Sequence, residues 1–431
     1  MRVEAGPAAP PARRRRSRID VLRSALATPA ARRFFAAHAQ SSLGTGLALL
    51  ALPLIALDRF GSPLAVSAVL LPDLLPAIVL GPLVGALVDR VGWRRCAVVA
   101  EILRCLGFAV VVVAGSLPLM MVGALLAGVG SAVFSPSALA SLTRIAGSDR
   151  RAGALALFGA LDDAGTTIGP ALGGALLALA QPTALLALNA VTYAVSALIL
   201  FRLPVTGGPV AETDRRRYPR SLFADARAGL REVAGRPEVR VLLWSSTGVV
   251  LCIGVTSVGE VILAREVLQV GGTGLALMIS AGGVGMVLGS LTARFTSAGP
   301  WRWRQVYLAG VFAMALELIA CSLLHSHLLV VLSLFVGGLG NGAALVHDRL
   351  LLASSAPESL HGRLFSLQRM CIAAAFTASF VGAGALITAL GVRPTLLVAG
   401  VGLALVTCAA APRLRKAWPA PPAPVAADAL A

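Results

Sequence analysis

A series of apolar runs, separated by short segments that hold most of the charge, constrains the fold of this chain most strongly. A helix needs about 20 apolar residues to cross the hydrocarbon core of a membrane. Twelve runs have roughly this length, in two sets of six on either side of a polar stretch from Arg202 to Arg240. We place them at 36–57, 64–88, 95–115, 118–141, 153–178, 183–202, 241–263, 272–293, 304–324, 327–347, 365–389 and 393–411.

The composition supports an all-α polytopic membrane protein. Apolar residues make up 57% of the chain and charged residues 13%, whereas a soluble domain is about half apolar and a quarter charged. The formal net charge of +17 would suit a nucleic-acid partner if the arginines formed a separate basic domain. They lie instead in the short segments between apolar runs, so we expect membrane lipids as partners and no nucleic acid.

The charges of the connecting segments alternate, and this predicts the orientation. One set of segments is rich in arginine and includes both ends of the chain, and the other set is nearly neutral. By the positive-inside rule the arginine-rich set is cytoplasmic. We therefore expect a protein of the bacterial cell membrane with both termini on the cytoplasmic side. Arg13–Arg16 are not followed by an apolar segment of secretory type, so we expect a retained tail.

These features predict five parts of the chain. They are a basic cytoplasmic tail at 1–33, an N-terminal six-helix half at 34–203, a cytoplasmic central loop at 204–240, a C-terminal six-helix half at 241–411 and a disordered Pro/Ala-rich tail at 412–431. Within the central loop, residues 221–234 have apolar residues at helical spacing. An amphipathic helix on the membrane surface and a solvated linker helix both fit this pattern.

The sequence gives almost no support for an enzyme. The connecting segments are short and contain no Ser/His/Asp set, no Walker-type phosphate loop and no metal-ligand spacing. The six cysteines form no Cys-x-x-Cys pair, and most of them fall within apolar runs. We therefore expect no cofactor and no metal site.

A charged motif joins the second and third runs. It reads Gly-x-Leu-x-Asp-Arg-x-Gly-x-Arg-Arg and comprises Gly85, Asp89, Arg90, Gly92, Arg94 and Arg95. It resembles the loop between helices 2 and 3 of major facilitator transporters, although an ordinary cytoplasmic turn is the simpler alternative. The resemblance implies that Asp89, with Arg90 and Arg94, contacts the other half of the protein and stabilises an outward-facing state.

Two sets of six runs and this motif together resemble the major facilitator superfamily over residues 34–411. The resemblance implies twelve transmembrane helices in two pseudo-symmetric halves around a central cavity, with rocking of one half against the other. We expect a monomer. Relatives often carry an arginine in the fourth helix that is thought to help proton coupling. Ala124 occupies that position here, which puts the coupling route in doubt.

A second motif lies in the fifth run, Gly165, Gly169, Pro170, Gly173 and Gly174. It is similar to the fifth-helix motif of drug:proton antiporters in this superfamily. Gly165, Gly169 and Gly173 lie four residues apart and share one helix face. The motif therefore suggests a sliding surface between the halves, with Gly285 and Gly289 of the eighth run as partners. Simple small-residue helix packing is the alternative.

Acidic residues within apolar runs are candidates for proton coupling, because a carboxylate at membrane depth is costly. We expect Asp73, Asp162 or Asp163 to couple protons, unless each is a structural acid bonded to a neighbouring Ser, Thr or Arg. A structural role is favoured for Glu317. Glu101 and Arg104, three residues apart, are expected to form a structural pair.

The predicted function is proton-coupled efflux of small lipophilic organic molecules by alternating access. We expect a drug, an antibiotic or a secondary metabolite as the small-molecule substrate. Export of a siderophore or other specific metabolite, and an uncoupled facilitator or importer, remain open. Residues 347–349 are expected at the membrane interface with their charges in water. The candidate cavity residues are Gln40, Ser41, Thr45, Thr167, Thr256 and Gln368.

Overall fold

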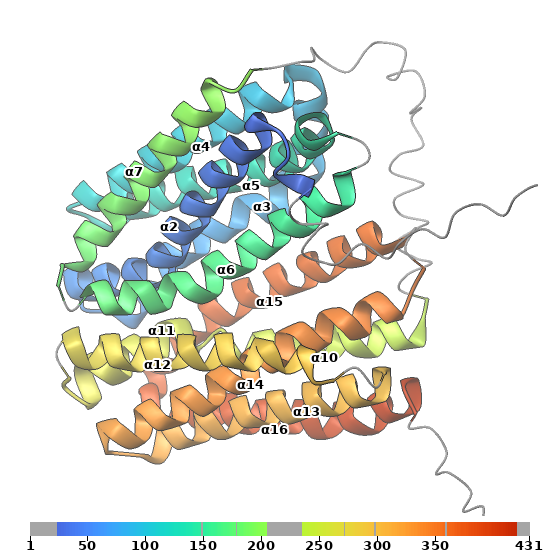
Figure 1. Ribbon diagram of the computed structural model, residues 1–431. Helices are drawn as coiled ribbons and strands as arrows, with labels where there is room; N and C mark the ends of the chain where they lie inside the picture. Colours follow the sequence, from blue (N-terminus) through green and yellow to red (C-terminus); the bar gives the residue numbers. More distant parts are fainter. Residues whose placement is uncertain are drawn as a thin grey trace, which may run out of the picture.

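The computed structural model describes residues 24–147, 150–177, 179–204, 235–270, 272–296, 299–357 and 360–419, and every regular element in these ranges is a helix. Figure 1 shows them as a bundle of long helices. The first six are α2 (Pro29–Phe60), α3 (Pro63–Val91), α4 (Trp93–Val113), α5 (Leu117–Ala146), α6 (Arg151–Leu177) and α7 (Pro182–Phe201). The others are α10 (Pro237–Ile253), α11 (Thr256–Ile262), η2 (Leu263–Val267), α12 (Gly272–Ser290), η3 (Leu291–Arg294), α13 (Pro300–Leu323), α14 (His327–Ser354), α15 (His361–Leu390) and α16 (Val392–Ala417).

The helices form two halves of six membrane spans each, as predicted. Helices α2 to α7 make the N-terminal half, and α10 to α16 make the C-terminal half, in which α10, α11 and η2 together form one broken span (Figure 1). By length and composition, ten helical segments are able to cross a membrane, and α3 adds a shorter apolar stretch, Pro63–Ala77. Together with α6, which packs along α2, they make up the twelve spans.

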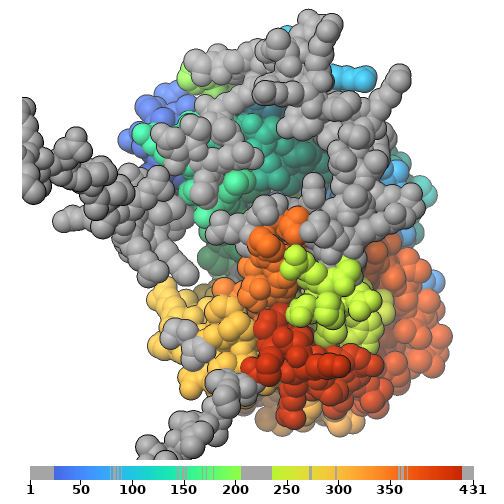
Figure 2. All heavy atoms as spheres, turned by 90° about the vertical axis from the view of Figure 1, so that its right-hand side faces the viewer, coloured from blue at the N-terminus to red at the C-terminus, as the bar shows by residue number. Residues whose placement is uncertain are grey.

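We call the two ends of the bundle the linker end and the far end. The linker end carries Phe201 and Pro237, on either side of the segment that connects the halves, together with Pro29 and Ala417 (Figure 1, right). The far end carries the opposite turns, such as Phe60–Pro63 and Leu390–Val392. Figure 2 views the linker end and shows the N-terminal half above the C-terminal half.

The helices extend beyond the predicted runs at both chain ends. Thr28 caps α2 by accepting a hydrogen bond from the Ala31 backbone, and Pro29 follows at the first helical position, where its fixed φ is favourable. Residues 29–33, predicted as tail, are therefore helical. Residues 412–417 are also helical, since α16 continues through Pro412 with basic residues in its last turn. The predicted helix at 221–234 lies outside the described residues.

An arginine closes the far end of one helix in each half. Arg59 donates hydrogen bonds to the carbonyls of Val111, Val112 and Ala114 at the end of α4. In the C-terminal half Arg393 donates to Ser322 and Leu324 at the end of α13. Such bonds satisfy carbonyl groups that a helix terminus leaves without partners.

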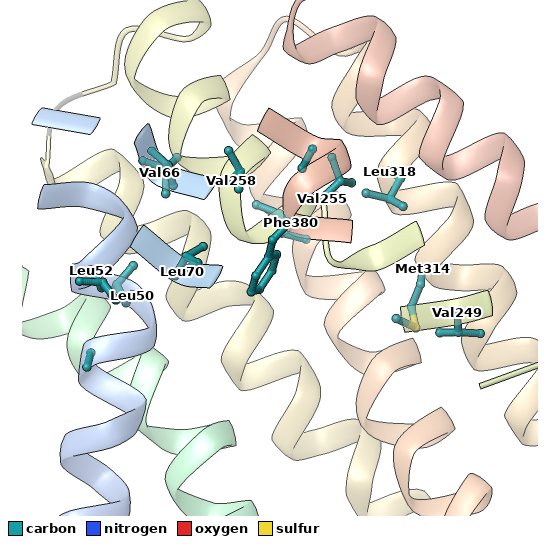
Figure 3. Close-up of a cluster of buried hydrophobic side chains, with 14 of the residues drawn as sticks. Leu50, Leu52, Val66, Leu70, Val249, Val255, Val258, Met314, Leu318 and Phe380 are labelled. Carbon is teal, nitrogen blue, oxygen red and sulfur yellow. The ribbon is translucent and has the colours of Figure 1, made fainter. Parts of the chain in front are cut away.

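Apolar side chains join the two halves toward the far end. Val66 and Leu70 of α3 belong to the same buried cluster as Val258 of α11 and Phe380 of α15 (Figure 3). The two helices also approach closely at this seal, since Ser67 of α3 lies against Gly384 of α15, where a Cβ would be 2.5 Å from the Ser67 Oγ. The far end of the structure is therefore closed between the halves by close packing.

Candidate functional site

The glycine face of α6 packs against α2 within the N-terminal half. A Cβ on Gly165 would lie 2.5 Å from the Ser42 carbonyl oxygen, and one on Gly169 would lie 2.5 Å from the Gly46 Cα. The expected role of this face as a sliding surface between the halves is therefore wrong for Gly165 and Gly169. Its small residues serve close helix packing, because backbones approach only where side chains are absent.

The remaining motif glycines divide between the two interfaces. Gly173 lies against Leu50 and Leu47 of α2, whereas Gly174 faces α12 of the other half, where a Cβ would be 2.7 Å from the Ser280 Oγ. Gly285 and Gly289, the expected partners, face α14 within their own half. Pro170 lies inside α6, which continues past it as one helix.

Close packing of α6 on α2 brings Asp162 to His38. The Asp162 Oδ1 lies 3.3 Å from His38 Nε2 and accepts a hydrogen bond of 3.4 Å from Ser42. The side chain of Asp162 is 43% exposed and that of His38 only 3%. His38 stacks on Phe158 with ring centroids 4.0 Å apart, and its Nδ1 is buried without a hydrogen-bond partner.

Asp163 faces the opposite half of the protein. Its two carboxylate oxygens accept hydrogen bonds from both terminal nitrogens of Arg349 on α14, with 2.9 Å between Nη2 and Oδ1. This ion pair lies near the middle of α6, and both side chains are close to half exposed. As adjacent helix positions require, Asp162 and Asp163 point to different targets, one within the N-terminal half and one across the bundle.

A buried charge network lies behind Asp162 and involves α2, α4 and α7. Glu101 is fully buried and accepts hydrogen bonds from Ser196 at 2.8 Å and from Ser41 at 3.4 Å. Arg104 lies 3.4 Å from the second Glu101 oxygen. Its other terminal nitrogen donates to the Tyr193 and Thr45 hydroxyls, 3.0 Å away in each case.

Arg104 is held in place by its surroundings on several sides. Its guanidinium lies 4.0 Å from the centre of the Tyr193 ring and 5.3 Å from that of Phe134. Gly130 of α5 provides room, because a Cβ there would be 2.6 Å from Arg104 Cγ. The Asp73 carboxyl of α3 also interacts electrostatically with Arg104. The spacing of Glu101 and Arg104 predicted a structural pair, and the structure enlarges it into a network of four helices.

The C-terminal half has fewer partners for its buried acids. Asp348 accepts one hydrogen bond of 2.5 Å from the Gln368 amide, and its Oδ1 is buried without a partner. Residues 347–349 were expected in water at the interface, but His347 is fully buried and Asp348 is 6% exposed. The expectation is wrong for these two residues, because they lie inside α14, which ends only at Ser354, whereas the Arg349 side chain is 45% exposed.

Several residues predicted to line a central cavity contact their own half instead. Gln40 donates to the Thr192 carbonyl of α7, Ser41 is 1% exposed, and Thr45 belongs to the Arg104 network. Gln368 is buried on Asp348, and Thr256 donates to the Ile253 carbonyl at the break between α10 and α11. The side chain of Thr167 lies outside the described residues. For Gln40, Ser41 and Thr45 the reason is that most of α2 is buried against other helices.

The charged motif occupies the turn between α3 and α4. Gly92 has a φ of 96°, a conformation that favours glycine. Arg94 donates to the Leu200 carbonyl at the end of α7 and lies over the Phe201 ring, so it contacts its own half. Arg90 and Arg95 are exposed. Gly85 and Asp89 belong to α3, and the side chain of Asp89 is outside the described residues.

Residues 34–379 match the family profile of the Major Facilitator Superfamily. The chain belongs to the major facilitator superfamily. It is therefore a multi-pass membrane transporter and not an enzyme.

Relatives and solved structures agree with this family. The transporter is 27% identical to the multidrug efflux pump Tap of Mycolicibacterium fortuitum, over 86% of this chain and 93% of Tap. It is 25% identical to the uncharacterized MFS-type transporter YfiS of Bacillus subtilis (strain 168), over 85% and 88% of the two chains. The nucleoside transporter NupG has the same fold, with a TM-score of 0.70 at 14% identity over 90% of this chain and all of that chain.

The buried network was the part of the site that the transporter's sequence revealed least. Ala124, where relatives often carry an arginine, is buried at 2% exposure in α5. The neighbouring helix α4 supplies a buried arginine instead, and Gly130 of α5 packs against it. The signal in the sequence was Glu101 and Arg104 one turn apart inside an apolar run, where two charges are costly without partners.

Proposed function

We propose that this transporter exports small lipophilic organic molecules in exchange for protons by alternating access. The observation that carries the proposal is the ion pair between Asp163 and Arg349, which joins the two halves near the middle of α6. Any rocking motion that separates α6 from α14 breaks this pair. Protonation of Asp163 removes the charge that holds Arg349, so proton binding lowers the cost of that motion.

Efflux is the direction that the comparisons favour. Similarity to Tap covers most of the chain, and a segment of 140 residues is 31% identical to the putative multidrug resistance protein MdtD of Escherichia coli. We place the transporter in the cytoplasmic membrane of a bacterium as a monomer, with its arginine-rich linker end inside and in contact with anionic lipids. The seal at the far end then separates the substrate site from the outside.

Asp162 and Asp73 are the other candidates for proton coupling. Asp162 is open to solvent on one side and bonded to His38 on the other. Asp73 interacts with Arg104 inside the N-terminal half. In this scheme the protonation of Asp163 releases the contact between the halves, while the other two acids act within one half.

The test uses inverted membrane vesicles with an acidic lumen and a pH-quenched dye. A panel of lipophilic antibiotics and siderophores is added to wild type, Asp163→Asn and Asp162→Asn. We expect dequenching with at least one lipophilic antibiotic in wild type and its loss in Asp163→Asn. Glu266→Gln, which removes an exposed acid near the far end, is the matched control and keeps the signal.

The alternatives predict different signals in the same vesicles. An uncoupled facilitator or importer gives substrate uptake without dequenching and is insensitive to Asp163→Asn. A dedicated exporter of siderophores or another metabolite dequenches with that compound alone and with none of the antibiotics. The first result contradicts proton exchange, and the second contradicts a broad lipophilic substrate class.

A further inference from the structure

We infer that Glu101 is a buried proton site, that Asp162 and His38 form the path by which a proton reaches it, and that Arg104 is the group that its protonation releases. The inference rests on the proposed proton coupling and goes beyond it, since it assigns the proton to a residue that does not face the other half. Arg104 and His38 are positioning and relay residues in this scheme.

One turn of α2 connects the exposed acid to the buried one. His38 contacts Asp162, Ser42 donates to Asp162, and Ser41 donates to Glu101. Residues three and four positions apart on a helix have neighbouring side chains. The series runs from a carboxylate that is 43% exposed through a histidine that is 3% exposed to a carboxylate that is fully buried. It is a row of polar side chains that leads into an apolar interior and is interrupted at His38 Nδ1, which has no hydrogen-bond partner.

The free nitrogen of His38 suits it to carry a proton. Its Nε2 faces Asp162 and the Phe158 carbonyl, while its Nδ1 is buried without a partner. Buried polar atoms without partners are costly and therefore need an explanation. An imidazole that accepts a proton on one nitrogen and releases one from the other needs its second nitrogen available, and histidine is the side chain best suited to this exchange.

The surroundings of Glu101 fit a group that changes charge. Ser41 and His38 face it from α2, Ser196 and Tyr193 lie on α7, and Arg104 lies on its own helix. As a carboxylate it accepts from two hydroxyls and Arg104, which are strong charge-assisted partners. Asp73 of α3 interacts with the same arginine. Arg104 therefore has electrostatic partners on two helices, and of these Glu101 is the one in direct contact.

In the proposed transfer His38 begins neutral with its proton on Nδ1. Asp162 takes a proton from water and passes it to His38 Nε2. A movement of the ring then brings Nδ1 to Ser41, three residues along α2, and Nδ1 releases its proton to the Ser41 hydroxyl. The Ser41 hydroxyl passes its own proton to Glu101 Oε1 and is restored by the incoming one. Asp162 ends ionised, His38 ends neutral with its proton on Nε2, and Glu101 gains one proton.

The consequence reaches the interface between the halves through α3. Once Glu101 is neutral, an ionised Asp73 on α3 is the carboxylate left to attract Arg104. A shift of Arg104 toward Asp73 acts on α3, the helix whose far end packs on α15 through Ser67 and Gly384. Two arrangements of one buried arginine thus bias the far-end contact between the halves.

The first test measures proton uptake by the purified full-length transporter after a rapid drop in pH, in weakly buffered detergent solution with a pH dye. Wild type is expected to show a slow phase from the buried site after a fast phase from exposed groups. Glu101→Gln loses the amplitude of the slow phase. His38→Gln keeps this amplitude but slows it at least about tenfold, because an amide relays no proton. A purely structural role for His38 would leave the rate unchanged.

The controls separate this inference from the proposed function. Glu317→Gln removes a carboxyl of α13 in the other half and keeps the slow phase. A slow phase that persists in Glu101→Gln, or an unchanged rate in His38→Gln, overturns the relay. If Glu101→Gln fails to fold, the rate in His38→Gln decides. A transporter that has the slow phase but shows no substrate-driven dequenching in vesicles contradicts the proposed function and leaves the relay standing.

Discussion

The two halves have the same number of spans but treat their buried charges differently. In the N-terminal half Glu101 has Arg104 and two hydroxyl donors as partners, all from that half. In the C-terminal half Asp348 has the Gln368 amide and one oxygen without a partner. The arginine next to Asp348, Arg349, extends across the bundle to Asp163.

The difference indicates a division of labour between the halves. An ion pair confined to one half is unaffected by rocking, and it is stable only while both of its charges are present. An ion pair between the halves is made and broken with each transition. In the proposed scheme the N-terminal half holds the charges that respond to a proton, and the C-terminal half contributes the charge that responds to the position of its partner.

Removal of Arg104 is expected to cause the largest loss of stability. Arg104→Leu leaves Glu101 as a buried carboxylate without its cation, and we expect a loss of about 3–5 kcal/mol in stability. Arg349→Leu removes the half-exposed partner of Asp163 and should cost no more than about 1 kcal/mol. Thermal unfolding of both purified variants measures the contrast. Equal losses of stability would contradict the expectation that the buried ion pair contributes more than the half-exposed one.

The next largest effect concerns the packing that brings Asp162 to His38. Gly169→Ala places a Cβ 2.5 Å from the Gly46 Cα, and overpacking of this kind costs about 1–3 kcal/mol. Gly159→Ala is the control on the same helix, since a Cβ there meets nothing within 4 Å. The control should be neutral or stabilising by up to about 1 kcal/mol. Unfolding temperatures in detergent that fall equally for both variants would contradict the assigned packing of α6 on α2.

Neutralising one buried acid in each half compares how strongly their partners stabilise them. Asp348→Asn keeps an oxygen that accepts from the Gln368 amide and removes only the charge, so we expect a change of about 1 kcal/mol. The same exchange at Glu101 alters contacts with three donors and should be more destabilising. Unfolding free energies of the two variants give the answer. A larger loss for Asp348→Asn would mean that the C-terminal acid is the more strongly stabilised one.

The smallest effect is expected at the far end. Asp58 of α2 and Arg265 of η2 form an ion pair of 3.3 Å that joins the halves, with both side chains over one-third exposed. Asp58→Asn should speed thiol labelling of a cysteine introduced at Ser67 by up to about fivefold, the equivalent of 1 kcal/mol. The labelling is done after replacement of the native cysteines. Glu266→Gln beside the pair is the control, and equal labelling in all variants would remove any gating role from Asp58.

The sequence predicted the spans because the length of an apolar run is a local property. It also predicted that Gly165 and Gly169 share a helix face, and the structure confirms this, since both face α2, as Asp162 does. The partner of Asp163 had no local signal, because Arg349 lies 186 positions away. Residues on different helices meet only through tertiary packing.

The assignment of faces failed for a related reason. Ser41 and Thr45 were expected in the central cavity, but α2 is enclosed by α6, α7 and other helices and has no polar face that marks a lumen. A small hydroxyl residue in such a helix fits a cavity and a buried network equally well. The burial of Glu101 and Arg104 could not be predicted for the same reason, because their partners Tyr193 and Ser196 lie on another helix, α7.

The exposed ion pair between Asp58 and Arg265 has a consequence for the setting in which the transporter works. Dissolved ions screen exposed charges over about 8 Å at physiological ionic strength and over shorter distances in brine. In the proposed orientation this pair faces the surrounding medium, whereas the network around Glu101 is shielded from it. The salinity of the habitat would then adjust how readily the seal at the far end opens, without altering the affinity of the interior for protons.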